Sequence, residues 1–156
     1  MNDKQYNALM KISTMLNDNG INWGLGGSAM LYLRGIQTSI ADLDIIVDLS
    51  SFHMLKRMLR RIDYKLSSYD EASDSNYTSK HFIQLNLDGV DIDIIVGFEI
   101  KTDNTHFIYP KGDDLSKESL YLDNAEVRLC DLQDWIEAYT VMGRTEKLKL
   151  IKNSNK

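Results

Sequence analysis

Two pairs of aspartates stand beside apolar runs, and they constrain the fold more than any other feature of the chain. Asp42 and Asp44 lead into apolar residues 45–47, and Asp91 and Asp93 lead into residues 94–96. A β-strand sends alternate side chains to one face, so the carboxylates of each pair point the same way, about 6.5 to 7 Å apart. Buried neighbouring carboxylates cannot remain ionised without a counter-ion. The pattern therefore predicts a Mg²⁺ site on core strands.

A glycine turn precedes the first acidic pair. Residues 21–25 are typical of a short strand, Gly26 and Gly27 break it, and Ser28 opens an apolar helix that stops at Gly35. Glycines let a backbone come close to a triphosphate, and a helix start offers N–H groups and a positive dipole end to an anion. Paired glycines between a strand and a helix more commonly serve helix packing, and that interpretation stays open.

Hydrophobic periodicity and turn residues predict the remaining elements. Helices are expected at 3–18, from Ser50 or Ser51 to 62, from Asp131 through 139, and at 145–152, and strands are expected at 43–47, 64–68, 81–87, 90–96 and 125–129. Asp88-Gly89 between two of these strands predicts a two-residue hairpin turn. Residues 70–79 are expected to form a long loop, and residues 101–120 are expected to be irregular.

Composition restricts the class of protein. A chain of 156 residues, 43% hydrophobic and 26% charged, is expected to form a single domain over residues 1–156. Its apolar runs are far shorter than the ~20 residues that span a membrane, so we expect a cytoplasmic protein with no membrane partner. A net charge of −5 argues against a broad nucleic-acid surface. Cys130 is the only cysteine, which excludes an intramolecular disulfide and a thiolate metal cluster.

The ordered motifs resemble those of the polymerase-beta-like nucleotidyltransferases: a glycine turn, a helix, Asp-x-Asp on a strand and a third Asp on a neighbouring strand. The pattern of residues 23–28, Gly35 and Asp42-Leu43-Asp44 is similar to that of the small lincosamide and aminoglycoside nucleotidyltransferases and related stand-alone bacterial domains. The resemblance covers roughly residues 20–150 in element order. It implies an α+β fold with a mixed sheet flanked by helices, a C-terminal helical segment, two Mg²⁺ ions and an NTP donor, with ATP expected.

The resemblance also implies roles for individual residues. Asp42 and Asp44 would bridge the two Mg²⁺ ions as catalytic carboxylates. Periodicity alone does not separate Asp91 from Asp93, but the third carboxylate of the family precedes apolar residues, which favours Asp93.

The remaining implied roles concern the nucleotide. Gly26, Gly27 and Ser28 would bind the donor, and Lys147 would reach its triphosphate from the last helix. Trp135 and Tyr139 are interpreted as core residues, with stacking on a base or an antibiotic ring as the alternative.

Two positions depart from the family pattern: Leu148 stands where an acidic residue often follows the lysine, and Gln37 stands where the preceding loop often has an arginine. The leading hypothesis is transfer of NMP from an NTP to a hydroxyl of an antibiotic-like small molecule or a protein, with release of pyrophosphate. The alternative is a catalytically inactive binding or regulatory module of a toxin–antitoxin or defence system. A second copy of the chain, in a homodimer, could complete the acceptor pocket of so short a domain.

Overall fold

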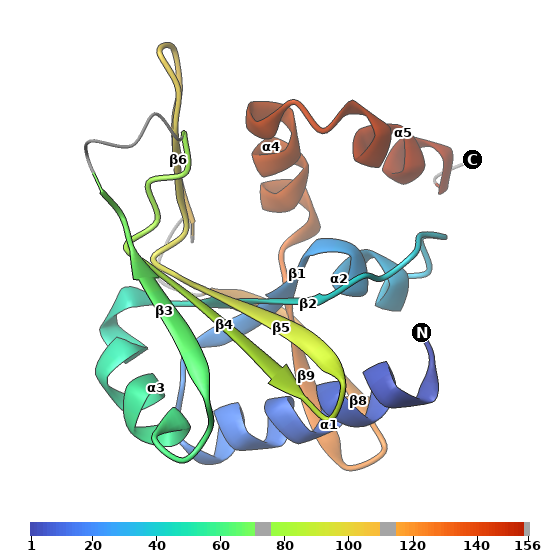
Figure 1. The fold of residues 1–156 in the computed structure, drawn as a ribbon. Coiled ribbons are helices and arrows are strands. Elements are labelled where there is room, and N and C mark those ends of the chain that lie inside the picture. The colour runs from blue at the N-terminus through green and yellow to red at the C-terminus, as the bar shows by residue number, and fades with distance from the viewer. Residues whose placement is uncertain (71–75, 110–114, 155–156) are drawn as a thin grey trace.

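A mixed β-sheet forms the centre of the computed structural model, which describes residues 1–70, 76–109 and 115–154 (Figure 1). The strands are β1 (Trp23–Gly26), β2 (Leu43–Val47), β3 (Tyr64–Ser68), β4 (His81–Leu87), β5 (Val90–Val96), β6 (Glu99–Lys101), β7 (His106–Ile108), β8 (Ser116–Leu122) and β9 (Ala125–Cys130). The helices are α1 (Asp3–Asp18), α2 (Gly27–Leu33), α3 (Phe52–Leu59), α4 (Leu132–Met142) and α5 (Thr145–Ser154), with a 3₁₀ turn, η1 (Leu49–Ser51).

Seven strands make up the main sheet, in the order β3-β4-β5-β2-β1-β9-β8, and β6 and β7 form a separate hairpin. β2 pairs in parallel with β5 and antiparallel with β1, while β1 pairs in parallel with β9. The outer strands are antiparallel to their neighbours. This arrangement confirms the α+β fold with a mixed sheet and a helical C-terminal segment.

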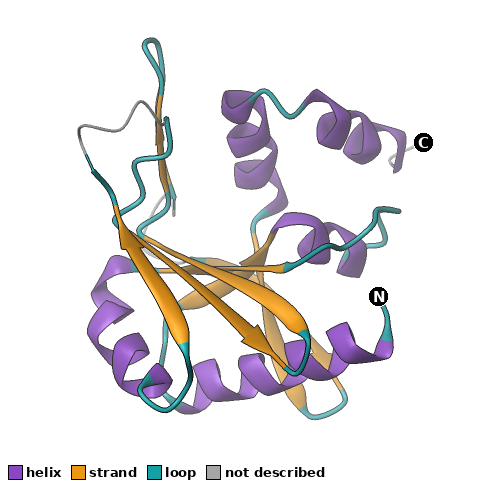
Figure 2. Ribbon diagram, viewed as in Figure 1, coloured by secondary structure: helices purple, strands orange, loops and turns teal. Residues whose placement is uncertain are grey.

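Helices lie on both sides of the sheet (Figure 2). α1 and α3 lie along one side, and α4 and α5 stand on the other. The predicted helix at 3–18 is confirmed: its apolar stripe of Leu9, Ile12 and Leu16 is fully buried, and Asn2 and Gln5 form a capping box at its start. No helix within the described residues is long and apolar enough to cross a membrane.

The hairpin of β4 and β5 has the predicted two-residue turn. Asp88 and Gly89 both take positive φ angles, 53° and 90°, as a tight hairpin with a right-handed twist requires. Residues alternate between buried and more exposed along both strands, so one face packs into the core and the other remains open. Asp91 and Asp93 lie on that open face.

The region 101–120 was expected to be irregular, and for its described residues this is wrong in part. It contains β7 and β8, while residues 110–114 lie outside the described part. β8 is an edge strand whose side chains are mostly exposed, so its pairing with β9 leaves no hydrophobic alternation to detect. The loop predicted at 70–79 holds an isolated bridge from Tyr77 to Ile100; residues 71–75 are not described.

Candidate active site

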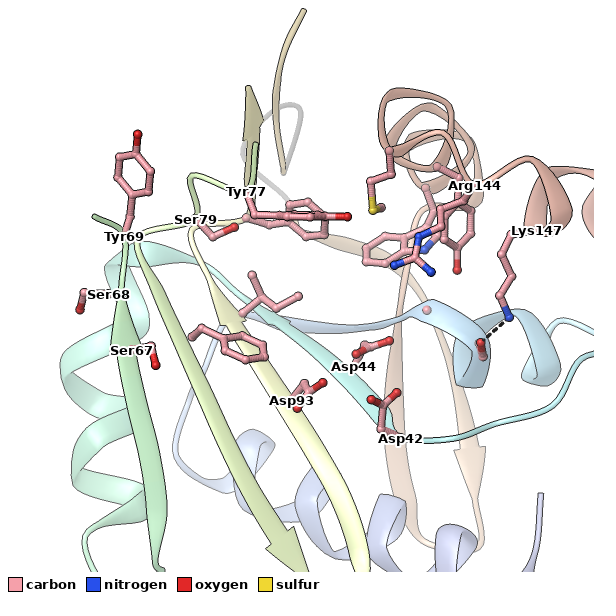
Figure 3. Close-up of a pocket in the computed structure, with 18 residues that line it drawn as sticks. Asp42, Asp44, Ser67, Ser68, Tyr69, Tyr77, Ser79, Asp93, Arg144 and Lys147 are labelled. Carbon is pink, nitrogen blue, oxygen red and sulfur yellow. Dashed lines mark hydrogen bonds between the residues drawn. The ribbon is translucent and has the colours of Figure 1, made fainter. Parts of the chain in front are cut away.

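The parallel pairing of β2 with β5 brings the acidic residues together. Asp44 lies directly opposite Asp93 across the two strands, and Asp42 precedes β2 by one residue, on the same side as Asp44. One carboxylate oxygen from each of these three residues lies within 4.8 Å of the other two. Figure 3 shows the three side chains at the bottom of one pocket.

Asp91 takes a different position from Asp93. It is exposed, and its carboxylate accepts a hydrogen bond at 3.0 Å from the Asn86 side-chain amide of the facing strand. The group of three carboxylates contains Asp93 and not Asp91. This placement agrees with the assignment of Asp93 as third carboxylate, while its catalytic role stays a prediction.

Burial and mutual repulsion perturb the acidic cluster. Burial, and then the charges of Asp42 and Asp93, raise the pKa of Asp44 from 3.8 to about 7. The positive charges of Arg144 and Lys147 act in the opposite direction. Burial and the charge of Asp42 likewise raise the pKa of Asp93 to about 6. Three carboxylates at this spacing form an oxygen-rich, anionic donor set, the kind that Mg²⁺ prefers.

The glycine turn packs against this cluster. Gly27 has φ +60°, and a Cβ atom at this position would collide with Oδ2 of Asp44. A Cβ atom on Gly26 would collide with the indole ring of Trp135. Both glycines are therefore needed for close packing, the interpretation left open above. Their contact with a triphosphate stays a prediction, and α2 has only seven residues, so its dipole is a weak argument for it.

Lys147 reaches the glycine turn from α5. Its Nζ donates to Oγ of Ser28 at 2.9 Å and to Oγ1 of Thr38 at 3.2 Å. Two of the predicted donor-binding residues, 119 positions apart, are thus in direct contact. Both line the same pocket as the three aspartates.

Arg144 also lines this pocket, and the sequence interpretation missed it. It follows Gly143, whose φ of +73° ends α4, and so stands in the turn between two helices. Its only sequence signal was its position three residues before Lys147, on the segment that leads into the same helix.

The pocket has a volume of about 680 Å³. Its lining includes hydroxyl and aromatic side chains from the ends of β3 and β4, from residues 77–79 and from α4. Trp135 and Tyr139 are buried, as predicted for core residues, and both also line the pocket, while their stacking on a base or an antibiotic ring stays a prediction. A second pocket of about 560 Å³ shares only Asp42 and Asp93 with the first.

The two departures from the family pattern have ordinary surroundings. Leu148 packs against the hydrophobic core, and Gln37 is exposed.

Cys130 is fully buried, and its neighbour Arg34 donates to its carbonyl oxygen at 2.7 Å. The Arg34 guanidinium also forms an ion pair at 3.2 Å with the carboxylate of Glu118, which lies on the edge strand β8.

The sequence matches no protein-family model and none of the curated protein sequences compared with it. Its structure is similar to that of a candidate nucleotidyltransferase from Thermotoga maritima, with 23% identity over 98% of this chain and 94% of that chain, and a TM-score of 0.73.

It is also similar to ANT(2″)-Ia in complex with adenylyl-2″-tobramycin, with 11% identity over 95% of this chain and 86% of that chain, and a TM-score of 0.64. The solution structure of the antibiotic-resistance factor ANT(2″)-Ia gives 12% identity over 89% and 71% of the two chains, and a TM-score of 0.61. At these identities the likeness concerns the fold: this chain has the nucleotidyltransferase fold that its motifs implied.

Proposed function

We propose that this protein is a Mg²⁺-dependent nucleotidyltransferase that moves NMP from an NTP, with ATP as the expected donor, to a hydroxyl group and releases pyrophosphate. The observation that carries the proposal is a single pocket that holds three clustered aspartates and a lysine bound to the serine of a glycine turn. The nucleotidyltransferase fold supports it.

Asp42, Asp44 and Asp93 would hold the metal, because their oxygens converge and their charges lack a direct cationic partner among the described residues. When bound, two Mg²⁺ ions would act as Lewis acids on the reacting phosphate. Asp93 would also accept the proton of the attacking hydroxyl.

Two pockets beside the aspartates support separate positions for the two substrates. Displacement at phosphorus is in line, so the attacking and leaving oxygens lie on opposite sides of the phosphorus atom. The larger pocket contains Lys147 and Ser28 and suits the triphosphate, whereas the second pocket meets it at Asp42 and Asp93. We therefore place the NTP in the first pocket and the acceptor hydroxyl at the opening of the second.

The second pocket suggests which acceptor to try first. Besides the shared carboxylates it is lined by Asp63 and Asp91, with Lys65 as its one basic residue among those described. An acceptor that carries amino groups beside its hydroxyls would suit this charge. ANT(2″)-Ia was solved with adenylyl-2″-tobramycin, so aminoglycosides are the first acceptors to test.

The test is a transfer assay with NTPs labelled on the α-phosphate, Mg²⁺ and a panel of aminoglycosides. We expect labelled product and pyrophosphate from the wild type and neither from Asp44→Asn, with the fold intact by circular dichroism. Asp88→Asn is a matched control, because it removes the same charge from an exposed hairpin turn. Equal activity in Asp44→Asn and the wild type would overturn the proposal.

Other outcomes of this assay are informative. NTP binding without transfer to any small-molecule or protein acceptor would support the inactive binding module instead. A native mass equal to one chain, together with full activity, would exclude the predicted homodimer as a requirement for the reaction.

A further inference from the structure

The turn between α4 and α5 brings a second cation into the pocket. The backbone N–H of Arg144 donates to the carbonyl oxygen of Tyr139 at 2.9 Å, which anchors the turn after Gly143. The Arg144 side chain lines the pocket, and Figure 3 shows it extending from this turn into the space above Asp44. Lys147 extends separately toward α2.

Within the described part of the chain, neither cation forms an ion pair. Among the described residues no carboxylate lies within 4.0 Å of Arg144 or Lys147, although three aspartates line the same pocket. Arg34 is different, because its guanidinium is paired with Glu118. The two unpaired cations and the acidic cluster thus line different sides of one space. A metal–polyphosphate complex matches both sides, since its phosphates suit the cations and its metal suits the carboxylates.

Building on the proposed function, we infer that the two cations divide the triphosphate: Arg144 binds the α-phosphate, which is transferred, and Lys147 binds the pyrophosphate portion, which leaves. Lys147 Nζ is held by Ser28 Oγ and Thr38 Oγ1, away from the carboxylates. Arg144 projects over Asp44, the residue predicted to hold the metals at the reacting phosphate.

This division follows the chemistry of the step. The acceptor oxygen forms a bond to the α-phosphorus, its proton passes to Asp93, and the bond from the α-phosphorus to the bridging oxygen breaks. The bonding electrons leave with pyrophosphate. Negative charge on the transferred phosphate would be stabilised by Arg144, and charge that develops on the leaving group would be stabilised by Lys147.

The two parts of ATP, AMP with the α-phosphate and pyrophosphate, separate the two roles. Binding of AMP and of inorganic pyrophosphate, each with Mg²⁺, is measured by competition with labelled ATP. We expect Arg144→Gln to weaken AMP at least roughly ten-fold and pyrophosphate less than about two-fold, because a charge-assisted phosphate contact is lost. Lys147→Gln should show the reverse, and both variants should weaken ATP.

Arg57→Gln removes the same charge from the exposed side of α3 and controls for net charge, and melting curves without ligand control for folding. Equal losses of AMP and pyrophosphate in Arg144→Gln, or no loss of either, would overturn the inference. With either of these two results, the proposed function is still supported if the wild type binds ATP with Mg²⁺. If the wild type binds none of ATP, AMP and pyrophosphate, the proposed function itself fails.

Discussion

The metal-free protein should become more stable when one carboxylate of the cluster is neutralised. In the folded protein the pKa of Asp44 is raised from 3.8 to about 7, so ionising this side chain opposes folding. One pKa unit is worth about 1.4 kcal/mol, which makes the cost about 4 kcal/mol once the pH exceeds 7. Asparagine has nearly the same shape and no charge, so Asp44→Asn should recover most of this free energy.

The pH dependence has a definite sign. The folded protein holds the proton of Asp44 more tightly than the unfolded chain does, so this residue lowers stability progressively as the pH rises from about 4 to about 7. The advantage of Asp44→Asn should therefore be about 2 kcal/mol at pH 5 and about 4 kcal/mol at pH 8. At low pH Asp44 is protonated in both the folded and the unfolded protein, so the two proteins should have the same free energy of unfolding.

Urea denaturation with EDTA present, at pH 5 and pH 8, measures both values. Asp88→Asn should differ from the wild type by less than about 0.5 to 1 kcal/mol at either pH, because its ion pair with Lys11 is exposed. The reasoning is refuted if Asp44→Asn is less stable than the wild type at pH 8, or if its advantage does not grow with pH.

Mg²⁺ should raise the melting temperature of the wild type and leave that of Asp44→Asn almost unchanged, and equal shifts in a Mg²⁺ series would contradict metal binding at this cluster. Gly27→Ala should lose about 2 kcal/mol or more in urea denaturation, because it combines positive φ with a collision against Asp44. Gly20→Ala has φ +66° and open space, so it measures the backbone cost alone, and equal losses would refute the collision. Thr38→Val should weaken ATP binding a few-fold in calorimetry, since it removes one anchor of Lys147; unchanged affinity would argue against that anchor.

The acidic cluster was accessible from the sequence because local rules determine most of it. Apolar runs located both strands, alternation oriented their aspartates, and Asp88-Gly89 defined the hairpin. The parallel pairing that sets Asp44 opposite Asp93 is not a local property. Metal chemistry suggested that the two pairs meet, and the family resemblance supplied the choice of Asp93 over Asp91, but neither predicted the parallel pairing.

Other parts of the site depend on packing between distant segments. Arg144 is one basic residue in a turn, and its approach to the pocket depends on how α4 and α5 stand over the sheet. The sequence predicts Gly26 in a turn, but it does not show that the absence of a Cβ atom makes room for the Trp135 ring. The hydrophobic periodicity of one segment does not predict which distant segment it contacts, so these contacts were visible only in the structure.

The most direct test of the central claim is a calorimetric titration of ATP into the protein with and without Mg²⁺, repeated with the double variant Asp42→Asn/Asp44→Asn. Our account predicts binding that requires Mg²⁺ and disappears in the double variant, because the carboxylates hold the metal that the triphosphate needs. ATP binding that persists unchanged in the double variant, or no binding of ATP or any other NTP to the wild type, would contradict it.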